Sequence, residues 1–215
     1  STSFQRSEIW RLLVEKQRIA WSQQWIASAQ ISANLKRAVI ASEDAGFAEH
    51  SGIEWEALEK AWERNQRSEA RVAKINARIE RQAARPNAAP PTKPPVAAKV
   101  VGGSTIAQQL AKNLFLAGER SLPRKAQEFI ITGMLEAMLS KGRILEIYLN
   151  NVEWGEGVFG AEAAARHYFR VGAVQLSPMA AARLAVMLPA PKRFEKRPLS
   201  AYVAARAGTV AARMG

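Results

Sequence analysis

The sequence has 215 residues, of which 48% are hydrophobic, and carries a formal net charge of +12. This length and composition are typical of globular protein with one substantial core, and they exclude a disordered tail. Cysteine is absent and there are two histidines, so disulfides, thiolate metal sites and His-rich metal sites are excluded. The charge favours a polyanion or an anionic lipid surface as partner, but no zinc-finger, basic-zipper or RNA-binding pattern accompanies it.

Residues 7–30 have the pattern of an amphipathic helix, because Ile9, Leu12 and Leu13 fall on neighbouring turns and three tryptophans add aromatic weight. Two interpretations stay open for this helix. It packs on the periphery of the domain, or it lies at a membrane interface, where Trp and Arg are favoured. The sequence shows no run of about 18 apolar residues that would span a bilayer and no signal peptide.

Residues 31–45 predict a second helix with Ser32 as N-cap and a buried stripe at Leu35, Ala38, Val39 and Ile40. A helical pattern rich in arginine follows over residues 53–84. Residues 86–95 contain five prolines, which favour an extended loop. We interpret this segment as a loop inside one domain, since the motifs on its two sides belong together.

The remaining chain predicts helices separated by glycine-rich joints. Ser104 or Thr105 caps a helix that reaches 116, and Ser121 with Pro123 opens another that reaches 140. Further helices are expected over 141–150, 158–169 and 176–188. Because no strand alternation is present, the predicted fold class is all-α.

The first candidate site is the carboxylate pair Glu43 and Asp44, at the point where an apolar stripe ends. A carboxylate held beside apolar groups has a raised pKa and can act as a base. Phe47, one turn after Glu43, would supply an apolar wall. His50 is equally compatible with capping, with packing or with a substrate contact.

The second candidate is the stretch from Gly102 to Leu116, which opens with Gly-Gly-Ser-Thr. Two glycines allow a ligand to approach the backbone closely, and a helix N-terminus there presents free N–H groups to an anion. A polar stripe follows, for which a solvated surface is the simpler alternative. The candidate ligand contacts are Ser104, Thr105, Gln108, Gln109, Lys112 and Asn113.

The third candidate is the stretch from Arg120 to Glu128. Arg124 and Glu128 are four residues apart and face together on a helix, which by itself indicates a single surface ion pair. The functional interpretation makes Arg120, Arg124 and Lys125 a phosphate clamp and Glu128 a second carboxylate of a cleft. A fourth block over 141–169 looks mainly structural, with Leu145, Tyr148 and Leu149 as core and with three glycines, at positions 155, 157 and 160, that mark a bend.

These motifs occur in the order E-D-x-x-F-x-x-H-x-G, G-G-S-T-I-x-Q-Q-L-x-K-N-L-F-L, R-K-x-x-E and R-I-L-E-x-Y-L-N. In this order they resemble the peptidoglycan glycosyltransferase family over roughly residues 31–195. No penicillin-binding S-x-x-K module follows, so the resemblance is to the monofunctional members, which are biosynthetic transglycosylases. Two features depart from the family pattern: Ala180 stands where Glu is frequent, and residues 66–100 look like a basic and Pro-rich insertion.

The resemblance implies a bilobal, lysozyme-like helical fold with a head and a smaller membrane-proximal jaw. We expect residues 1–30 to form an N-terminal membrane-proximal helix and 31–215 the glycosyltransferase domain. The implied reaction polymerises lipid II into β-1,4-linked glycan with inversion at the donor C1 and release of undecaprenyl diphosphate. Glu43 would be the base and Glu128 a second catalytic carboxylate that orients cations or sugar, with the other candidate residues binding substrate.

No cofactor is expected to be obligatory, although Mg²⁺ or Mn²⁺ could assist at the diphosphate near Asp44 or Glu128, for which no metal ligand set is evident. The expected partners are lipid II, the growing glycan, an anionic membrane surface and other cell-wall synthesis proteins, but no nucleic acid. We expect the native protein to carry a transmembrane anchor before Ser1, on the periplasmic face of a bacterial inner membrane. A lysozyme-like hydrolase and a basic nucleic-acid-binding protein are the alternatives. The first needs no diphosphate clamp, and the second leaves the Glu43–Asp44 pair unexplained.

Overall fold

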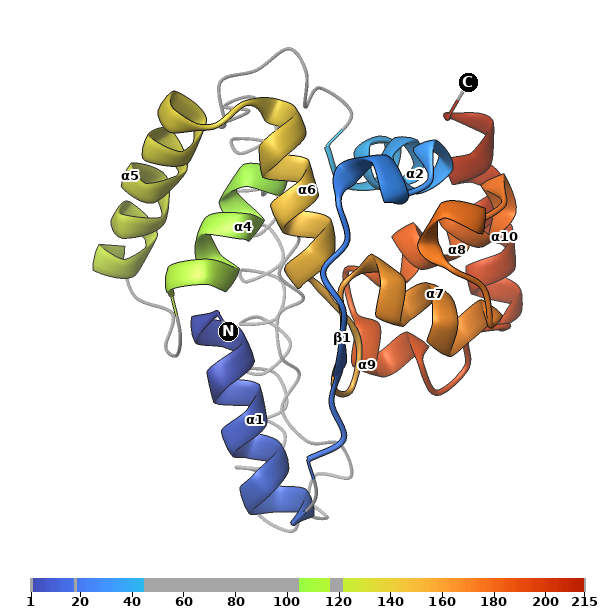
Figure 1. The fold of residues 1–215 in the computed structure, drawn as a ribbon, viewed down its shortest axis with the longest axis horizontal. Helices are drawn as coiled ribbons and strands as arrows, with labels where there is room; N and C mark the ends of the chain where they lie inside the picture. Colours follow the sequence, from blue (N-terminus) through green and yellow to red (C-terminus); the bar gives the residue numbers. More distant parts are fainter. Residues whose placement is uncertain (1, 18, 45–104, 117–121, 215) are drawn as a thin grey trace, which may run out of the picture. The chain divides into compact units, whose positions relative to one another are not determined.

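A computed structural model describes residues 2–17, 19–44, 105–116 and 122–214, and only the backbone of 122–126. This part of the chain is mostly helical, which confirms the predicted all-α class (Figure 1). The helices are α1 (Ser3–Lys16), α2 (Ala33–Glu43), α4 (Ile106–Phe115), α5 (Leu122–Met138), α6 (Lys141–Asn151), α7 (Ala161–Phe169), α8 (Pro178–Met187), α9 (Pro191–Phe194) and α10 (Ala201–Ala212). Two 3₁₀ turns, Ser28–Gln30 and Ala173–Gln175, connect them.

The described helices belong to one compact unit that joins Ser1–Ile53 to Thr105–Gly215. The helix predicted over 53–84, the proline segment 86–95 and the insertion 66–100 lie outside the described residues. The division of the chain at residue 30 and the two-lobe arrangement therefore stay predictions.

Side-chain caps set the starts of the helices. The Ser32 hydroxyl accepts a hydrogen bond from the Asn34 N–H (3.2 Å) at the start of α2, as predicted. Thr105, rather than Ser104, caps α4 by accepting from the Gln108 N–H (3.2 Å). Pro178 follows the N-cap Ser177 in α8, where its missing N–H costs nothing. These caps satisfy backbone donors that the first turn leaves free.

The core packs α8 against both α2 and α10, and α4 against α5 and α6 (Figure 1). Leu35, Ala38 and Val39 of α2 are fully buried, which confirms the predicted stripe at three positions. The fourth, Ile40, is partly buried and packs against the core. Ala-rich α8 lets its neighbours approach closely. Helix α10 was not predicted, although Ser200 caps it and Val203, Ala207 and Val210 form a buried stripe.

A three-stranded sheet was not predicted either. It pairs β1 (Ser22–Gln23) in parallel with β3 (Val158–Phe159), and β3 antiparallel with β2 (Glu153–Gly155). Strands of two or three residues are too short to show alternation in the sequence. The predicted glycine bend is confirmed: Gly160 has φ +82°, and a Cβ there would lie 2.7 Å from the Asn150 carbonyl oxygen.

The helix predicted over 7–30 is wrong in its second half. Helix α1 ends at Lys16, and Gln17 follows in the left-handed conformation with φ 49°. An extended segment then leads to Ile26, whose N–H and carbonyl are both bonded to the Asn150 side chain at 2.9 and 3.0 Å. The apolar positions of this predicted helix differ in burial, since Leu12 is buried and Leu13 is 46% exposed.

Charged side chains attach α1 to the rest of the unit. Glu8 is buried and accepts hydrogen bonds from Arg11 on its own helix and from Lys192 of α9 (2.6 Å). Burial alone would raise the pKa of Glu8, but the bonds from Arg11 and Lys192 outweigh it and lower that pKa. Glu153 of β2 is buried in the same cluster, 3.5 Å from the Lys192 ammonium. Among the described residues, its Oε1 accepts no hydrogen bond.

Burial raises the pKa of Glu153 to about 7, which Lys192 partly offsets and the charge of Glu8 reinforces. The native state therefore holds a proton between the ordinary value of 4.5 and about 7 that the unfolded chain has released. We predict that this group makes the free energy of unfolding fall, by at most about 3 kcal/mol, as pH rises through this window. Glu153→Gln should remove that slope in urea unfolding between pH 5 and 8. Glu156→Gln, at the exposed Arg11 pair, is the control and should retain the slope. Equal slopes in wild type and Glu153→Gln would contradict the assignment.

Candidate active site

Glu43 is the last residue of α2, and its carboxylate accepts a hydrogen bond from a neutral donor. Its Oε2 accepts a hydrogen bond from the Gln109 Nε2 of α4 (3.0 Å). Burial raises the pKa of Glu43 and the charge of Asp44 adds to this, whereas hydrogen bonds from Gln109 and Ser42 and the charge of Lys112 oppose it. The net shift is upward, which makes this carboxylate a stronger base than an exposed glutamate.

Asp44 has a different task from its neighbour. It ends α2 and is buried, and its Oδ2 accepts a hydrogen bond from the Ile106 N–H (3.0 Å) at the first position of α4. A carboxylate at a helix N-terminus satisfies a free donor and interacts favourably with the helix dipole. The adjacent carboxylates are therefore not redundant: Asp44 joins the two helices that bring Gln109 to Glu43.

The consecutive glutamines of α4 face different surroundings. Gln109 reaches Glu43 with its nitrogen, and its Oε1 accepts a hydrogen bond from the Tyr148 hydroxyl of α6 (2.9 Å). Gln108 is buried, and neither atom of its amide has a hydrogen-bond partner among the described residues. A buried amide in this state is costly unless another group reaches it.

Lys112 is exposed on α4, three residues after Gln109, and its charge acts on Glu43. Asn113, next to it, is half-buried. The structure thus brings together Glu43, Gln109 and Lys112 of the predicted set. It adds Tyr148, which the sequence placed in the core. A signal for this was the choice of Tyr instead of Phe in an apolar block, since a buried phenol hydroxyl needs a partner.

Glu128 is the second predicted carboxylate. Glu128 is buried on α5, which packs against α4. The Glu128 main-chain carbonyl accepts a hydrogen bond from the Thr132 hydroxyl (2.7 Å). The side chains of Arg124 and Lys125 are not described, so the pairing of Arg124 with Glu128 and the place of both cations in the phosphate clamp stay predictions. Phe47, His50, Ser104 and Arg120 also lie outside the described residues.

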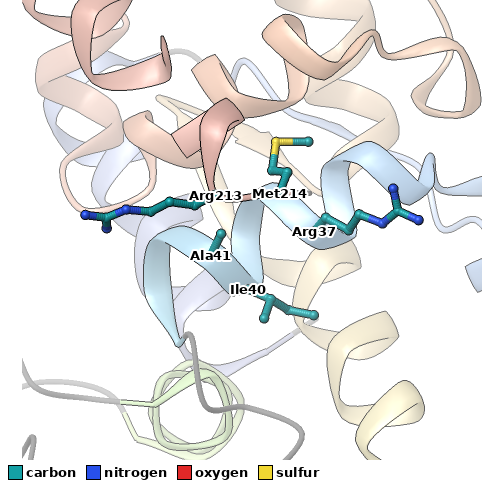
Figure 2. Close-up of a pocket in the computed structure, with 5 residues that line it drawn as sticks. All are labelled: Arg37, Ile40, Ala41, Arg213 and Met214. Atoms are coloured by element: carbon teal, nitrogen blue, oxygen red, sulfur yellow. The ribbon is translucent and has the colours of Figure 1, made fainter. Parts of the chain in front are cut away.

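A pocket of about 480 Å³ lies between α2 and α10, lined by Arg37, Ile40, Ala41, Arg213 and Met214. Figure 2 shows the guanidinium groups of Arg37 and Arg213 extending to opposite sides, so they do not converge on one ligand. The pocket is lined by none of the candidate carboxylates or their hydrogen-bond partners. The described residues contain no group of three or more acidic or histidine side chains that could hold a metal ion.

The described site combines a helical scaffold with a half-buried carboxylate of raised pKa, which accepts a hydrogen bond from an amide and is acted on by a lysine charge. Such an arrangement is suited to a general base. The sequence model of the transglycosylase family matches residues 12–85 and 93–215. The chain belongs to the transglycosylase family, and its class is that of the glycosyltransferases.

Relatives of high similarity carry one name. The chain is 48% identical over 215 residues to a biosynthetic peptidoglycan transglycosylase of Paraburkholderia phytofirmans, covering all of this chain and 78% of that protein. It is 49% identical to proteins of the same name from Burkholderia thailandensis and Burkholderia pseudomallei, covering all of this chain and 73% of each.

Proposed function

We propose that this enzyme polymerises lipid II into β-1,4-linked glycan strands for the bacterial cell wall. Membership of the transglycosylase family and the names of its relatives support a role as peptidoglycan glycosyltransferase. The observation that carries the chemistry is the half-buried Glu43 carboxylate, whose pKa is raised while an amide N–H holds it. A lysozyme-like hydrolase is not supported, because the relatives are named for biosynthesis.

In this proposal Glu43 takes the proton of the acceptor 4-hydroxyl as that oxygen attacks the donor C1. A sugar hydroxyl is a poor nucleophile, so removal of its proton during attack is worth about 10²–10⁴-fold in rate. The new C1–O4 bond forms while the bond from C1 to the diphosphate oxygen breaks, with inversion. The proton ends on Glu43 and the electron pair leaves with undecaprenyl diphosphate.

The leaving group carries negative charge that cations must balance as the bond breaks. Lys112 is the described candidate, and we propose Arg120, Arg124 and Lys125 as the rest of the clamp. Glu128 would orient these cations or the sugar. A divalent ion is proposed as an optional aid only. Of its candidate ligands, Asp44 already uses one oxygen to cap α4, so the diphosphate itself would have to supply most of the contacts.

The remaining substrate contacts are proposed from the sequence motifs. Thr105 is buried and uses its hydroxyl to cap α4, so a direct contact would add to that role. The buried amide of Gln108, unmatched among the described residues, supports a polar group of the substrate as its partner. Ser104, Asn113, Phe47 and His50 complete the proposed set.

We also propose that the enzyme works on the periplasmic face of the inner membrane, with anionic lipid as a partner. The described helices include none that is long and apolar enough to cross a bilayer. The net charge of +12 and the exposed Trp10, Leu13 and Val14 of α1 support a surface contact with lipid. Other cell-wall synthesis proteins are expected partners.

A lipid II polymerisation assay should distinguish the two carboxylates. Glu43→Gln keeps the shape of the side chain but cannot accept the proton, so kcat should fall by about 10²-fold or more. Glu128→Gln should lose less, because orienting a cation is less direct than taking the proton. Binding of lipid II to Glu43→Gln should survive. Near-normal turnover by Glu43→Gln together with inactive Glu128→Gln would exchange the two roles.

The role of the Lys112 cation can be tested in the same assay. Lys112→Ala should both raise KM for lipid II and lower kcat, since contacts between charge and diphosphate act before and during bond cleavage. Lys141→Ala removes a lysine that is paired with Glu136 at the start of α6, and it should leave both constants nearly unchanged. An unchanged KM in Lys112→Ala would place Lys112 outside the donor site.

The membrane proposal predicts that the chain binds vesicles containing anionic lipid and that binding weakens as salt rises. Trp10, which is 68% exposed, should contribute, so Trp10→Ser should reduce vesicle binding severalfold in a sedimentation assay. Leu199→Ser, at an equally exposed apolar residue between α9 and α10, should not. Absence of binding at low salt would mean that the positive charge does not serve the membrane.

A further inference from the structure

Tyr148 of α6 has no role in the proposed reaction as described above. Its side chain is fully buried, and its hydroxyl lies 2.9 Å from Gln109 Oε1. The nitrogen of the same amide lies 3.0 Å from Glu43 Oε2. A hydrogen-bonded row therefore runs from α6 through α4 to the end of α2 and stops at the proposed base.

The direction of the hydrogen bonds in this row is fixed by chemistry. Burial, and then the charge of Glu43, raise the pKa of the Tyr148 phenol well above its ordinary value of 10.0, so the hydroxyl keeps its proton. Among the described residues that proton has one acceptor, the amide oxygen of Gln109. With the oxygen bound to Tyr148, the amide nitrogen must face Glu43.

The opposite orientation of the amide is possible but unfavourable. If the amide of Gln109 turned over, its nitrogen would donate to the Tyr148 oxygen and its oxygen would face Glu43. The buried Tyr148 proton would then have no acceptor among the described residues, which is costly. Tyr148 therefore biases the amide toward the orientation that the structure shows.

The two orientations of the amide favour different protonation states of Glu43. An N–H that faces the carboxyl stabilises the ionised form, whereas an amide oxygen repels it and accepts from the protonated form. Other groups also act on the protonation of Glu43. Asp44 disfavours its charge, and Ser42 and Lys112 favour it, and none of these depends on Tyr148.

We propose that Tyr148 is a positioning residue that locks the Gln109 amide with its nitrogen toward Glu43 and so keeps this carboxylate ready to accept the acceptor's proton. The inference rests on the proposed function of Glu43 as base. It assigns Gln109 to orientation of the base, in place of the substrate contact predicted from sequence.

Tyr148→Phe removes the hydroxyl and little else, so the amide should turn over freely. The acid limb of the kcat–pH profile should then move upward by about one pH unit, which is about a tenfold loss at a pH on that limb. At pH values above the limb, turnover should return to within about threefold of wild type. A purely structural defect would lower kcat by the same factor at every pH.

The matched control is Tyr168→Phe. The Tyr168 hydroxyl also donates a hydrogen bond, to the Trp154 carbonyl (2.7 Å), and burial also raises its pKa. Its loss should cost stability without moving the acid limb. Gln109→Met removes the amide, so the side chain can neither donate a hydrogen bond to Glu43 nor be oriented by Tyr148. This variant should shift the acid limb as Tyr148→Phe does, and the double variant Tyr148→Phe/Gln109→Met should shift it no further.

A readout independent of activity is the titration of Glu43 itself. In protein labelled with ¹³C at the glutamate carboxyls, its signal is the one missing from Glu43→Gln. The titration midpoint of Glu43 should rise in Tyr148→Phe and should be unchanged in Tyr168→Phe. An unmoved midpoint, or shifts that add in the double variant, would overturn the proposal.

The titration and the polymerisation assay separate the two hypotheses. If the wild type forms no polymer, the proposed function fails, and the titration still decides whether Tyr148 controls Glu43. If the wild type polymerises lipid II but the midpoint is unmoved, only the role of Tyr148 fails. If Tyr148→Phe does not fold, Tyr148→Met, which also removes the hydroxyl, takes its place in both measurements.

Discussion

The withdrawal of the Glu43 carboxylate from water is the constraint on which this site depends. A buried carboxylate becomes a better base, but its ionised form must be compensated or it will simply stay protonated. The compensation comes from hydrogen bonds of the Gln109 amide and of Ser42 and from the charge of Lys112, and the Tyr148 hydroxyl binds the far side of the amide. Asp44 fixes α4 to the end of α2 through the Ile106 N–H, so one pair of adjacent acids supplies both the proposed base and the contact that holds its partner helix.

A second glutamate with a raised pKa shows why pKa alone does not identify the base. Burial also raises the pKa of Glu153, but this carboxylate lies in an ion cluster where Lys192 already pairs with Glu8 at 2.6 Å. Its proton balances a local excess of carboxylates, which is a matter of stability. Glu43 is held instead by the amide nitrogen of Gln109, a neutral donor, beside an exposed cation. That setting allows a proton to come and go during turnover, and it is the reason for preferring Glu43.

What the sequence predicted depended on whether the signal was local. The caps at Ser32 and Thr105, the buried stripe of α2 and the glycine bend all follow from neighbouring residues and are confirmed. Glu43 was singled out because two adjacent acids at the end of an apolar stripe are unusual, and its role as base stays a prediction. The row from Tyr148 to Glu43 joins residues 105 positions apart, and no pattern within a helix shows which side chain its hydroxyl will meet. The short strands were missed for the same reason, since their pairing with residues far along the chain gives them their shape.

Helix α1 was misread because its partner surface is charged. Its buried residues are Gln5, Glu8 and Leu12, while Trp10 and Val14 face outward. A rule that places apolar residues inside assumes an apolar partner, but α1 lies against Asn151 and Lys192 and forms polar contacts with them. Once the polar side is used for attachment, the apolar residues remain on the free side. The exposed Trp10, Leu13 and Val14 are costly in water and would be favourable at a lipid headgroup region, so the packed and the interfacial interpretations of α1 are compatible with each other.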